Sequence, residues 1–530
     1  MGKILGNIGV MLLSTTLFFG TAEVLVSIIK ADKVRNYYDD QTLKALGDPV
    51  PKKADGEYRI YIFGGSSAYG FPVSERYSIT AWLRTSFPYL LKDRNIKVIN
   101  GGWPGKASYH VIEGVRAAMK YDPDLYIIYA GHNEFTASNR IYRDNKLYWF
   151  NMQMQFRSAL YKYLTVRFNR LRRKMIYGSS GHPEKEYREE AIAKKVYPEI
   201  EVSSAEYAEI VSQYKSNMEN VIRYAQRHGV DLVMLTMPSN LKGVPPGSSR
   251  HETELDDLAL KRWEKAYAKG REFEDAGDHA KAVIAYNKAI EIDPTYAELH
   301  YRLAIALEVL GRFENAKKEY LLAKDLDARP WRAKSAVNEV IAELGREFDV
   351  PVVEIVKAFE KLSPHGIPGG SLFIDNVHPT VEAQQVITDE ILGTLARRNL
   401  VARSGEWDWQ AVTAARADKD NEIWKVDGSV NAYRYILRGL HLWEQGRYDQ
   451  VIEDLETGLK LMPDFLESYG FIADSYWQLG ESARALETYE LFQRKDPKIF
   501  EFTLERYPNL EHSYSQSLDV GQALVRATKQ

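Results

Sequence analysis

Five short apolar runs, each four to eight residues long, punctuate the chain. They are Tyr58–Phe63, Ile96–Ile99, Leu125–Tyr129, Val230–Met237 and Val350–Ile355. Stretches with the period of an amphipathic helix separate several of these runs. Short buried strands that alternate with helices predict a mostly parallel sheet covered on both faces. The expected fold class is therefore α/β, with a three-layer α/β/α architecture.

Glycine follows three of the predicted strands, at Gly64-Gly65, Gly101-Gly102 and Gly131. In open parallel sheets the carboxyl ends of the strands are where ligands bind. The functional site is therefore expected at these three turns.

Two other segments carry an internal repeat. In the first, Gly277, Ala282, Tyr286 and Ala289 recur as Gly311, Ala316, Tyr320 and Ala323. In the second, Gly446 and Pro463 recur as Gly480 and Pro497. The spacing of about 34 residues resembles that of tetratricopeptide repeats, in which small residues let two helices approach and an aromatic fills the groove. The resemblance covers about 257–328 and 430–500, and it implies helical surfaces that bind a protein partner.

The amino-terminal segment from Ile4 to Ile29 is almost entirely apolar and lies between Lys3 and Lys30. It is long enough to cross a bilayer. Because Ser27–Ala31 matches a cleavage site poorly, an uncleaved signal anchor is favoured over a removed signal peptide. Basic residues on both sides leave the orientation open.

These patterns divide the chain into consecutive parts. We expect an anchor at 1–35, the first part of the sheet domain at 54–256, inserted repeats at 257–328, the second part of the sheet domain at 329–402, and further repeats with a tail at 403–530. An aromatic and basic insertion at about 141–202 is either a solvated helix face whose aromatics pack inward, or a helix that lies on anionic headgroups or lines the active site.

The composition excludes several classes of partner and of catalytic group. With 70 basic and 73 acidic residues the formal net charge is −3, which gives no reason to expect nucleic acid as a partner. The absence of cysteine excludes disulfides, thiolate metal sites and cysteine nucleophiles. No histidine spacing typical of metal ligands and no phosphate-binding glycine loop occurs, so neither a metal nor a cofactor is expected.

Acyl transfer needs a nucleophile, a base, a group that orients the base, and donors for the oxyanion. Ser66 follows the first strand in Phe63-Gly64-Gly65, where glycines leave a hydroxyl exposed at the sheet edge. Asn133 stands just beyond the third strand and offers a carboxamide donor, although an asparagine there also suits a helix cap. Ser67, next in the chain, is the alternative nucleophile.

The base is expected near the end of the domain, in Asp375-Asn376-Val377-His378. The three-residue spacing allows the carboxylate of Asp375 to meet one ring nitrogen of His378 while the other nitrogen faces the serine. Pro379 and Thr380 then suit the start of a closing helix.

At these residues the sequence resembles the SGNH/GDSL hydrolase family, whose four blocks correspond to FGGSS, NGGWPG, GHNE and DNVH. The resemblance spans about 58–135 and 230–395. It implies Ser66 as nucleophile and first oxyanion donor, Gly102 and Asn133 as the other two donors, His378 as base and Asp375 as its orienter. The family's usual Asp before the serine is Gly65 here, and Glu134 replaces the usual Asp after Asn133.

The leading interpretation is a membrane-anchored esterase or O-acyltransferase acting on O-acetyl groups of an extracytoplasmic polysaccharide, since membrane-tethered relatives often act on O-acyl groups of polysaccharide or lipid. A lysophospholipase or thioesterase on membrane lipid would use the same site. A catalytically silent scaffold that recruits partners through its repeats is the alternative from another class. The residues leave open the acyl group, the acceptor, the repeat partner and the oligomeric state.

Overall fold

A computed structural model describes most of the chain. The described residues are 52–72, 77–136, 199–251, 255–402, 406–417, 429–444 and 446–527, with single positions at 21 and between 154 and 168. The predicted anchor, apart from Thr21, and most of the predicted 141–202 insertion lie outside them. None of the helices in these ranges combines the length and apolar character needed to cross a membrane.

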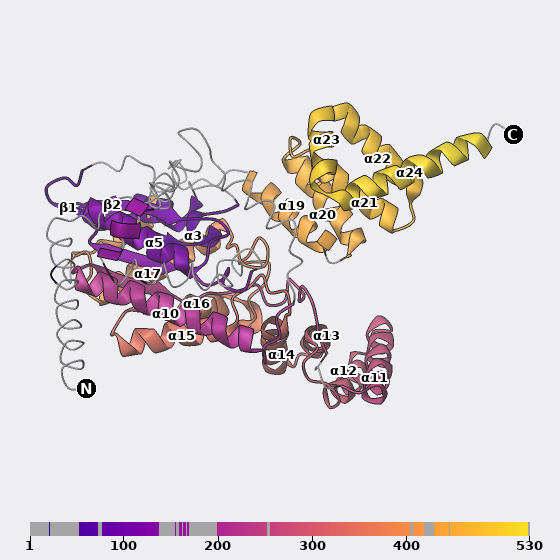
Figure 1. The fold of residues 1–530 in the computed structure, drawn as a ribbon, viewed down its shortest axis with the longest axis horizontal. Helices are drawn as coiled ribbons and strands as arrows, with labels where there is room; N and C mark the ends of the chain where they lie inside the picture. Colours follow the sequence, from indigo (N-terminus) through magenta and orange to yellow (C-terminus); the bar gives the residue numbers. More distant parts are fainter. Residues whose placement is uncertain are drawn as a thin grey trace, which may run out of the picture.

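A five-stranded, wholly parallel sheet forms the centre of the first domain (Figure 1). Its strands are β1 (Glu57–Gly64), β2 (Asn95–Gly102), β3 (Leu125–Tyr129), β4 (Asp231–Leu235) and β5 (Val352–Val353), in the order β2-β1-β3-β4-β5. The middle strand β3 is buried at every position, as a continuous apolar run predicts. Each predicted strand is thus confirmed, although the last is only two residues long.

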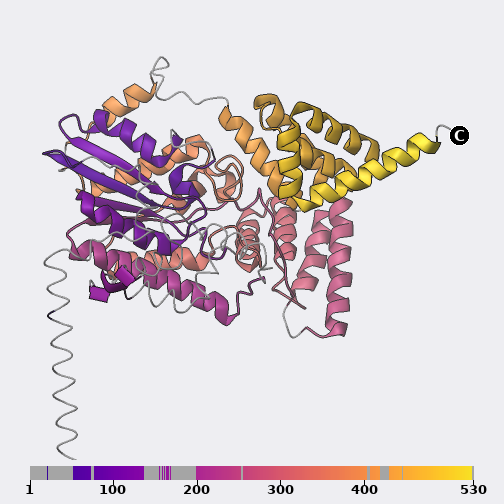
Figure 2. The same ribbon diagram turned by 45° about the horizontal axis from the view of Figure 1, so that its top comes forward.

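Helices cover both faces of the sheet, which gives the predicted three layers (Figure 2). One face carries α5 (Ser108–Ala118), α10 (Ala205–Arg227) and α15 (Ser335–Glu347), which pack together. The other carries α4 (Ile79–Leu90), α16 (Ile355–Leu362), α17 (Val381–Arg397) and α18 (Trp409–Ala417). Short helices α3 (Ser66–Tyr69), η3 (Met119–Tyr121) and η4 (Pro364–Gly366) complete this domain.

Polar caps begin several of these helices. The side chains of Ser78, Ser204 and Thr380 accept backbone N–H groups at the starts of α4, α10 and α17. Such caps satisfy donors that the first turn of a helix leaves without a partner. The predicted helix start after Pro379 is confirmed.

Between β4 and β5 the chain leaves the sheet to form four antiparallel helices. These are α11 (Asp257–Asp275), α12 (His279–Ile290), α13 (Ala297–Val309) and α14 (Phe313–Leu326). Gly277 and Gly311, which are 34 residues apart in the sequence, both adopt positive φ, at 75° and 72°, in the turn between two helices. The ring of Tyr286 fills the space where Gly270 has no side chain. The expected roles of small and aromatic residues are confirmed.

A second helical array follows the domain. It comprises α19 (Ser429–Glu444), α20 (Tyr448–Leu461), α21 (Ser468–Gln478), α22 (Ser482–Lys495), α23 (Pro497–Arg506) and α24 (Pro508–Ala527). Gly446 and Gly480 occupy the turns within its helix pairs, again with positive φ. Tyr489 and Phe492 are fully buried in its own hydrophobic core, which is separate from the core around the sheet.

Candidate active site

Ser66 lies where β1 gives way to the one-turn helix α3, at the carboxyl edge of the sheet. Two glycines make this turn possible. A Cβ on Gly64 would stand 1.9 Å from the carbonyl oxygen of Tyr129 in β3, and a Cβ on Gly65 would stand 2.7 Å from Nδ2 of Asn133. The absence of side chains therefore brings the serine turn directly against the end of β3.

The loop before α17 presents a preorganised Asp–His pair. Asp375 Oδ1 accepts the backbone N–H groups of Val377 (2.9 Å) and His378 (2.8 Å), and Oδ2 lies 2.5 Å from His378 Nδ1. Burial acts to raise the pKa of Asp375, but the charge of His378 and these hydrogen bonds outweigh it, so the pKa lies below its ordinary value. Asp375 is thus held as a carboxylate that fixes both the loop and the imidazole.

His378 Nε2 lies 2.7 Å from Ser66 Oγ, so the two predicted blocks meet although 312 positions separate them. With the proton on Nδ1, the ring donates to Asp375 and accepts from the serine. Ser67 is placed differently: it is 3% exposed and its hydroxyl donates to the carbonyl of Val377 at 3.2 Å. Of the two serines, only Ser66 faces the base.

Asn133 lies beside the same serine turn. Its Nδ2 donates to the carbonyl of Lys106 at 3.0 Å and faces the backbone at Gly65, one residue before Ser66. Among the described residues no group accepts the backbone N–H of Ser66. The N–H of Ser66 and the carboxamide of Asn133 are therefore two donor groups close to the serine turn.

Gly102, the third predicted oxyanion donor, lies in a turn at the end of β2. Its N–H donates to Asn100 Oδ1 at 2.9 Å, within its own turn. A Cβ on Gly102 would stand 2.4 Å from the backbone nitrogen of Tyr69. The physical reason for glycine here is the close approach of β2 to α3, and its N–H is already used in the turn.

Glu134 links the end of β3 to the start of α5. Its carboxylate accepts the N–H of Ser108 (2.9 Å) and the Ser108 hydroxyl (2.7 Å), which in turn accepts from Asn217 Nδ2 (2.9 Å). Burial raises the pKa of Glu134 to about 7, even though both bonds from Ser108 act in the opposite direction. The carboxyl of Glu134, next to Asn133, therefore connects the end of β3 to the start of α5.

The raised pKa of Glu134 predicts that the free energy of unfolding depends on pH. The folded protein holds the Glu134 proton up to about pH 7, whereas an unfolded chain releases it at about pH 4.3. The free energy of unfolding should thus decrease between these values, by up to about 3 kcal/mol. In Glu134→Gln, which keeps an acceptor for Ser108, this decrease should disappear. Urea denaturation at pH 4.5 and pH 8 tests this, and parallel pH dependences of the two proteins would contradict it.

Two further residues at the site were not marked by the sequence. His132 is 5% exposed and its Nδ1 accepts the N–H of Ala333 at 3.2 Å. Burial, aided by repulsion from His378, lowers the pKa of His132 to about 3. Asn240 donates through Nδ2 to the carbonyl of Asp375 at 2.8 Å. The position of His132 inside the GHNE block is a signal that could have indicated it, whereas nothing in the sequence around Asn240 indicates its contact.

Within the described ranges no cluster of three His, Asp or Glu side chains is arranged to hold a metal ion. A parallel α/β sheet that carries a hydrogen-bonded Ser–His–Asp set at the carboxyl ends of its strands defines a domain of the serine-hydrolase type.

Family models agree with the repeat prediction. A "TPR repeat" model matches residues 270–311, and "Tetratricopeptide repeat" models match 297–330 and 436–498. The chain therefore contains tetratricopeptide repeats in both helical arrays. The uncharacterized protein MJ0572 of Methanocaldococcus jannaschii is 42% identical over 62 residues, which are 12% of this chain and 72% of that protein. Over this segment the two chains belong to one family.

Solved structures to which the chain is similar include GDSL-like lipases, acylhydrolases and esterases. A GDSL-like lipase from Bacteroides thetaiotaomicron is 10% identical with a TM-score of 0.30, covering 68% of this chain and 98% of its own. The lipase/acylhydrolase from Enterococcus faecalis is 11% identical (TM-score 0.28; 64% and 96%). The psychrotrophic esterase EstA from Pseudoalteromonas is 8% identical (TM-score 0.27; 64% and 98%).

Proposed function

We propose that this chain is a serine-dependent acyl-ester hydrolase or O-acyltransferase that works through an acyl-serine intermediate. The observation that carries the proposal is the unbroken series of hydrogen bonds from Ser66 Oγ through His378 to Asp375. A nucleophile, a base and an orienting carboxylate in this geometry are what acyl transfer requires.

In the proposed first step, His378 Nε2 takes the proton of Ser66 while Oγ attacks the ester carbonyl. The developing oxyanion is stabilised by the N–H of Ser66 and the carboxamide of Asn133. When the bond to the alcohol breaks, His378 returns the proton to the leaving oxygen. In the second step, water or a sugar hydroxyl gives its proton to His378 and attacks the acyl-serine. As the bond to Ser66 Oγ breaks, His378 returns the proton to Ser66 and the free acid or the new ester leaves. Asp375 stabilises the imidazolium in both steps.

We further propose that the substrate is an O-acetylated polysaccharide outside the cytoplasmic membrane, with the enzyme tethered by Ile4–Ile29. What supports this is the predicted anchor together with the resemblance of the four catalytic blocks to SGNH hydrolases. The tetratricopeptide repeats favour a protein partner in addition.

A fluorophosphonate probe tests the serine chemistry. Purified protein should be labelled at one site, and Ser66→Ala should lose the label completely because Ser66 is the hydroxyl that contacts His378 in the part of the chain that the structure describes. Ser67→Ala is the matched control and should still be labelled. If folded wild-type protein resists the probe, or if Ser66→Ala reacts equally well, the chain is better explained as a repeat scaffold.

A substrate panel then separates the enzyme classes. Acetylated sugars and short-chain acyl lipids are offered to the same preparation, with Ser66→Ala as blank. Release of acetate from the sugars is expected. If only the acyl lipids are hydrolysed, the proposal of a polysaccharide substrate is wrong, and the chain is a lysophospholipase or thioesterase.

A further inference from the structure

The segment 327–335, here named the return segment, leads from α14 of the inserted repeats back to α15 of the sheet domain. It is fastened to the end of α14 by two buried lysines. Lys334 Nζ donates to the carbonyls of Asp325 (2.5 Å) and Asp327 (2.6 Å). Lys324 Nζ donates to the carbonyl of Ala333 (3.1 Å) and pairs with Asp325. A movement of the end of α14 must therefore move the return segment with it.

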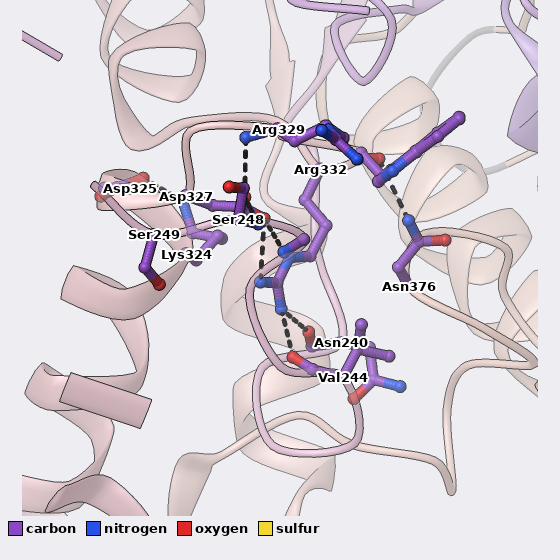
Figure 3. A network of polar contacts seen from close by, with 12 residues as sticks. Asn240, Val244, Ser248, Ser249, Lys324, Asp325, Asp327, Arg329, Arg332 and Asn376 are labelled. Carbon is purple, nitrogen blue, oxygen red and sulfur yellow. Dashed lines mark hydrogen bonds and ion pairs between the residues drawn. The ribbon is translucent and has the colours of Figure 1, made fainter. Parts of the chain in front are cut away.

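Arg332, in the middle of the return segment, reaches into the sheet domain (Figure 3). It is 2% exposed, and its Nη1 donates to the carbonyls of Asn240 and Val244, both at 2.9 Å. Nη2 lies 3.8 Å from Asp327 Oδ2. A buried guanidinium is costly unless it is paired and hydrogen-bonded. These partners therefore hold Arg332 in place and, through it, the loop that follows β4.

Asn240, whose carbonyl accepts from Arg332, contacts in turn the segment Asp375–His378, here named the acid–base loop. Its backbone N–H donates to the carbonyl of Asn376 at 3.0 Å, and its Nδ2 donates to the carbonyl of Asp375 at 2.8 Å. Its Oδ1 accepts the N–H of Gly243 at 2.8 Å, which fixes the orientation of the carboxamide. The backbone of Asp375 is thus anchored to Asn240, while its carboxylate faces His378.

The return segment touches the site at two other points. The N–H of Ala333 donates to His132 Nδ1 (3.2 Å), next to Asn133, and Asn376 Nδ2 donates to the carbonyl of Trp331 (3.4 Å). The return segment therefore contacts both the residue next to Asn133 and the loop that carries Asp375 and His378. Figure 3 shows the contact of Asn376. Packed networks with few alternative arrangements transmit displacement rather than absorb it.

We propose that Asn240 and Arg332 are positioning residues through which the inserted repeats set the geometry of the acid–base loop. Asn240 fixes the backbone that carries Asp375 and His378, and Arg332 fixes Asn240 to the return segment. Binding of a protein partner that shifts α14 would then change the rate of acylation of Ser66. This inference rests on the proposed function, because the rate at which Ser66 attacks is its readout.

The test measures fluorophosphonate labelling as a function of probe concentration, which separates the limiting rate constant from the half-saturating concentration. In Asn240→Ala and Arg332→Met the limiting rate constant should fall roughly tenfold to a hundredfold, as expected when catalytic groups are displaced by a fraction of an ångström to an ångström. The half-saturating concentration and the final labelled fraction should stay unchanged. A merely structural role would lower the labelled fraction instead.

Arg329→Met is the matched control, since Arg329 lies on the same segment with its side chain 65% exposed. It should label like wild type. Arg332→Lys, which keeps a cation able to donate to two carbonyls, should give a rate between those of wild type and Arg332→Met. If Arg332→Met does not fold, the rate constants of Asn240→Ala and Arg332→Lys test the positioning role instead.

Wild-type rate constants in folded Asn240→Ala and Arg332 variants would overturn the positioning role and leave the proposed function intact. Wild-type protein that takes up no label would overturn the proposed function, and this inference with it.

Discussion

Replacing His378 by alanine should slow acylation of Ser66 by roughly four to six orders of magnitude. The serine hydroxyl would keep its place in α3, but it would lose the acceptor that lies 2.7 Å away. No other titratable side chain of the described residues stands in hydrogen-bonding contact with Ser66. The rate of fluorophosphonate labelling, or of product release from an activated acetyl ester, measures the loss.

A histidine far from the site provides the control. His228 is exposed at the end of α10, and His228→Ala should react at the wild-type rate. Circular dichroism should find His378→Ala folded, since the side chain is a small part of a large core. A rate within tenfold of wild type in His378→Ala would mean that another base serves Ser66.

Substitution of Gly64 by alanine should prevent stable folding of the sheet domain. The added methyl would lie 1.9 Å from the carbonyl oxygen of Tyr129 and 2.8 Å from Ala68 Cβ. The nearest atom belongs to the backbone of β3, which pairs with β1 at this register. Relief therefore requires the two strands to separate, which costs more than about 3 kcal/mol.

Thermal and urea unfolding, together with soluble yield, measure this cost. Gly393→Ala is the matched substitution, because Gly393 lies in α17 and meets only the flexible end of Arg397. It should be neutral or stabilising by up to about 1 kcal/mol, as alanine favours a helix interior. Equal stabilities of the two variants would show that the approach of β1 to β3 is looser than described.

Local patterns were sufficient to predict the layered α/β fold and the repeats. Buried parallel strands need continuous apolar runs, and Leu125–Tyr129 is such a run. Tightly paired helices need small residues at fixed intervals, as Ala282 and Ala316 illustrate. The short strand β5 was predicted longer than it is, because an apolar run does not reveal where pairing with β4 ends.

The site was predictable where chemistry constrains a short segment. Asp375 and His378 stand three residues apart, a spacing that by itself allows their hydrogen bond. The resemblance of FGGSS to the family block favoured Ser66 over Ser67, and the structure adds the physical reason: α3 directs the Ser66 hydroxyl to His378 and the Ser67 hydroxyl to the carbonyl of Val377. The role of Gly102 as the third donor stays a prediction, because a glycine that presents its N–H and a glycine needed for close packing look identical in a sequence.

The sequence by itself thus determined the class of fold, the repeats and the residue types of an acyl-transfer site, since each follows from periodicity or from short spacings. Only the tertiary structure decided which serine faces His378, and that Asn240 and Arg332 connect the repeats to the acid–base loop. Arg332 and Asn240 are 92 positions apart. A contact of that kind depends on where an inserted array returns to the sheet, which no local pattern encodes.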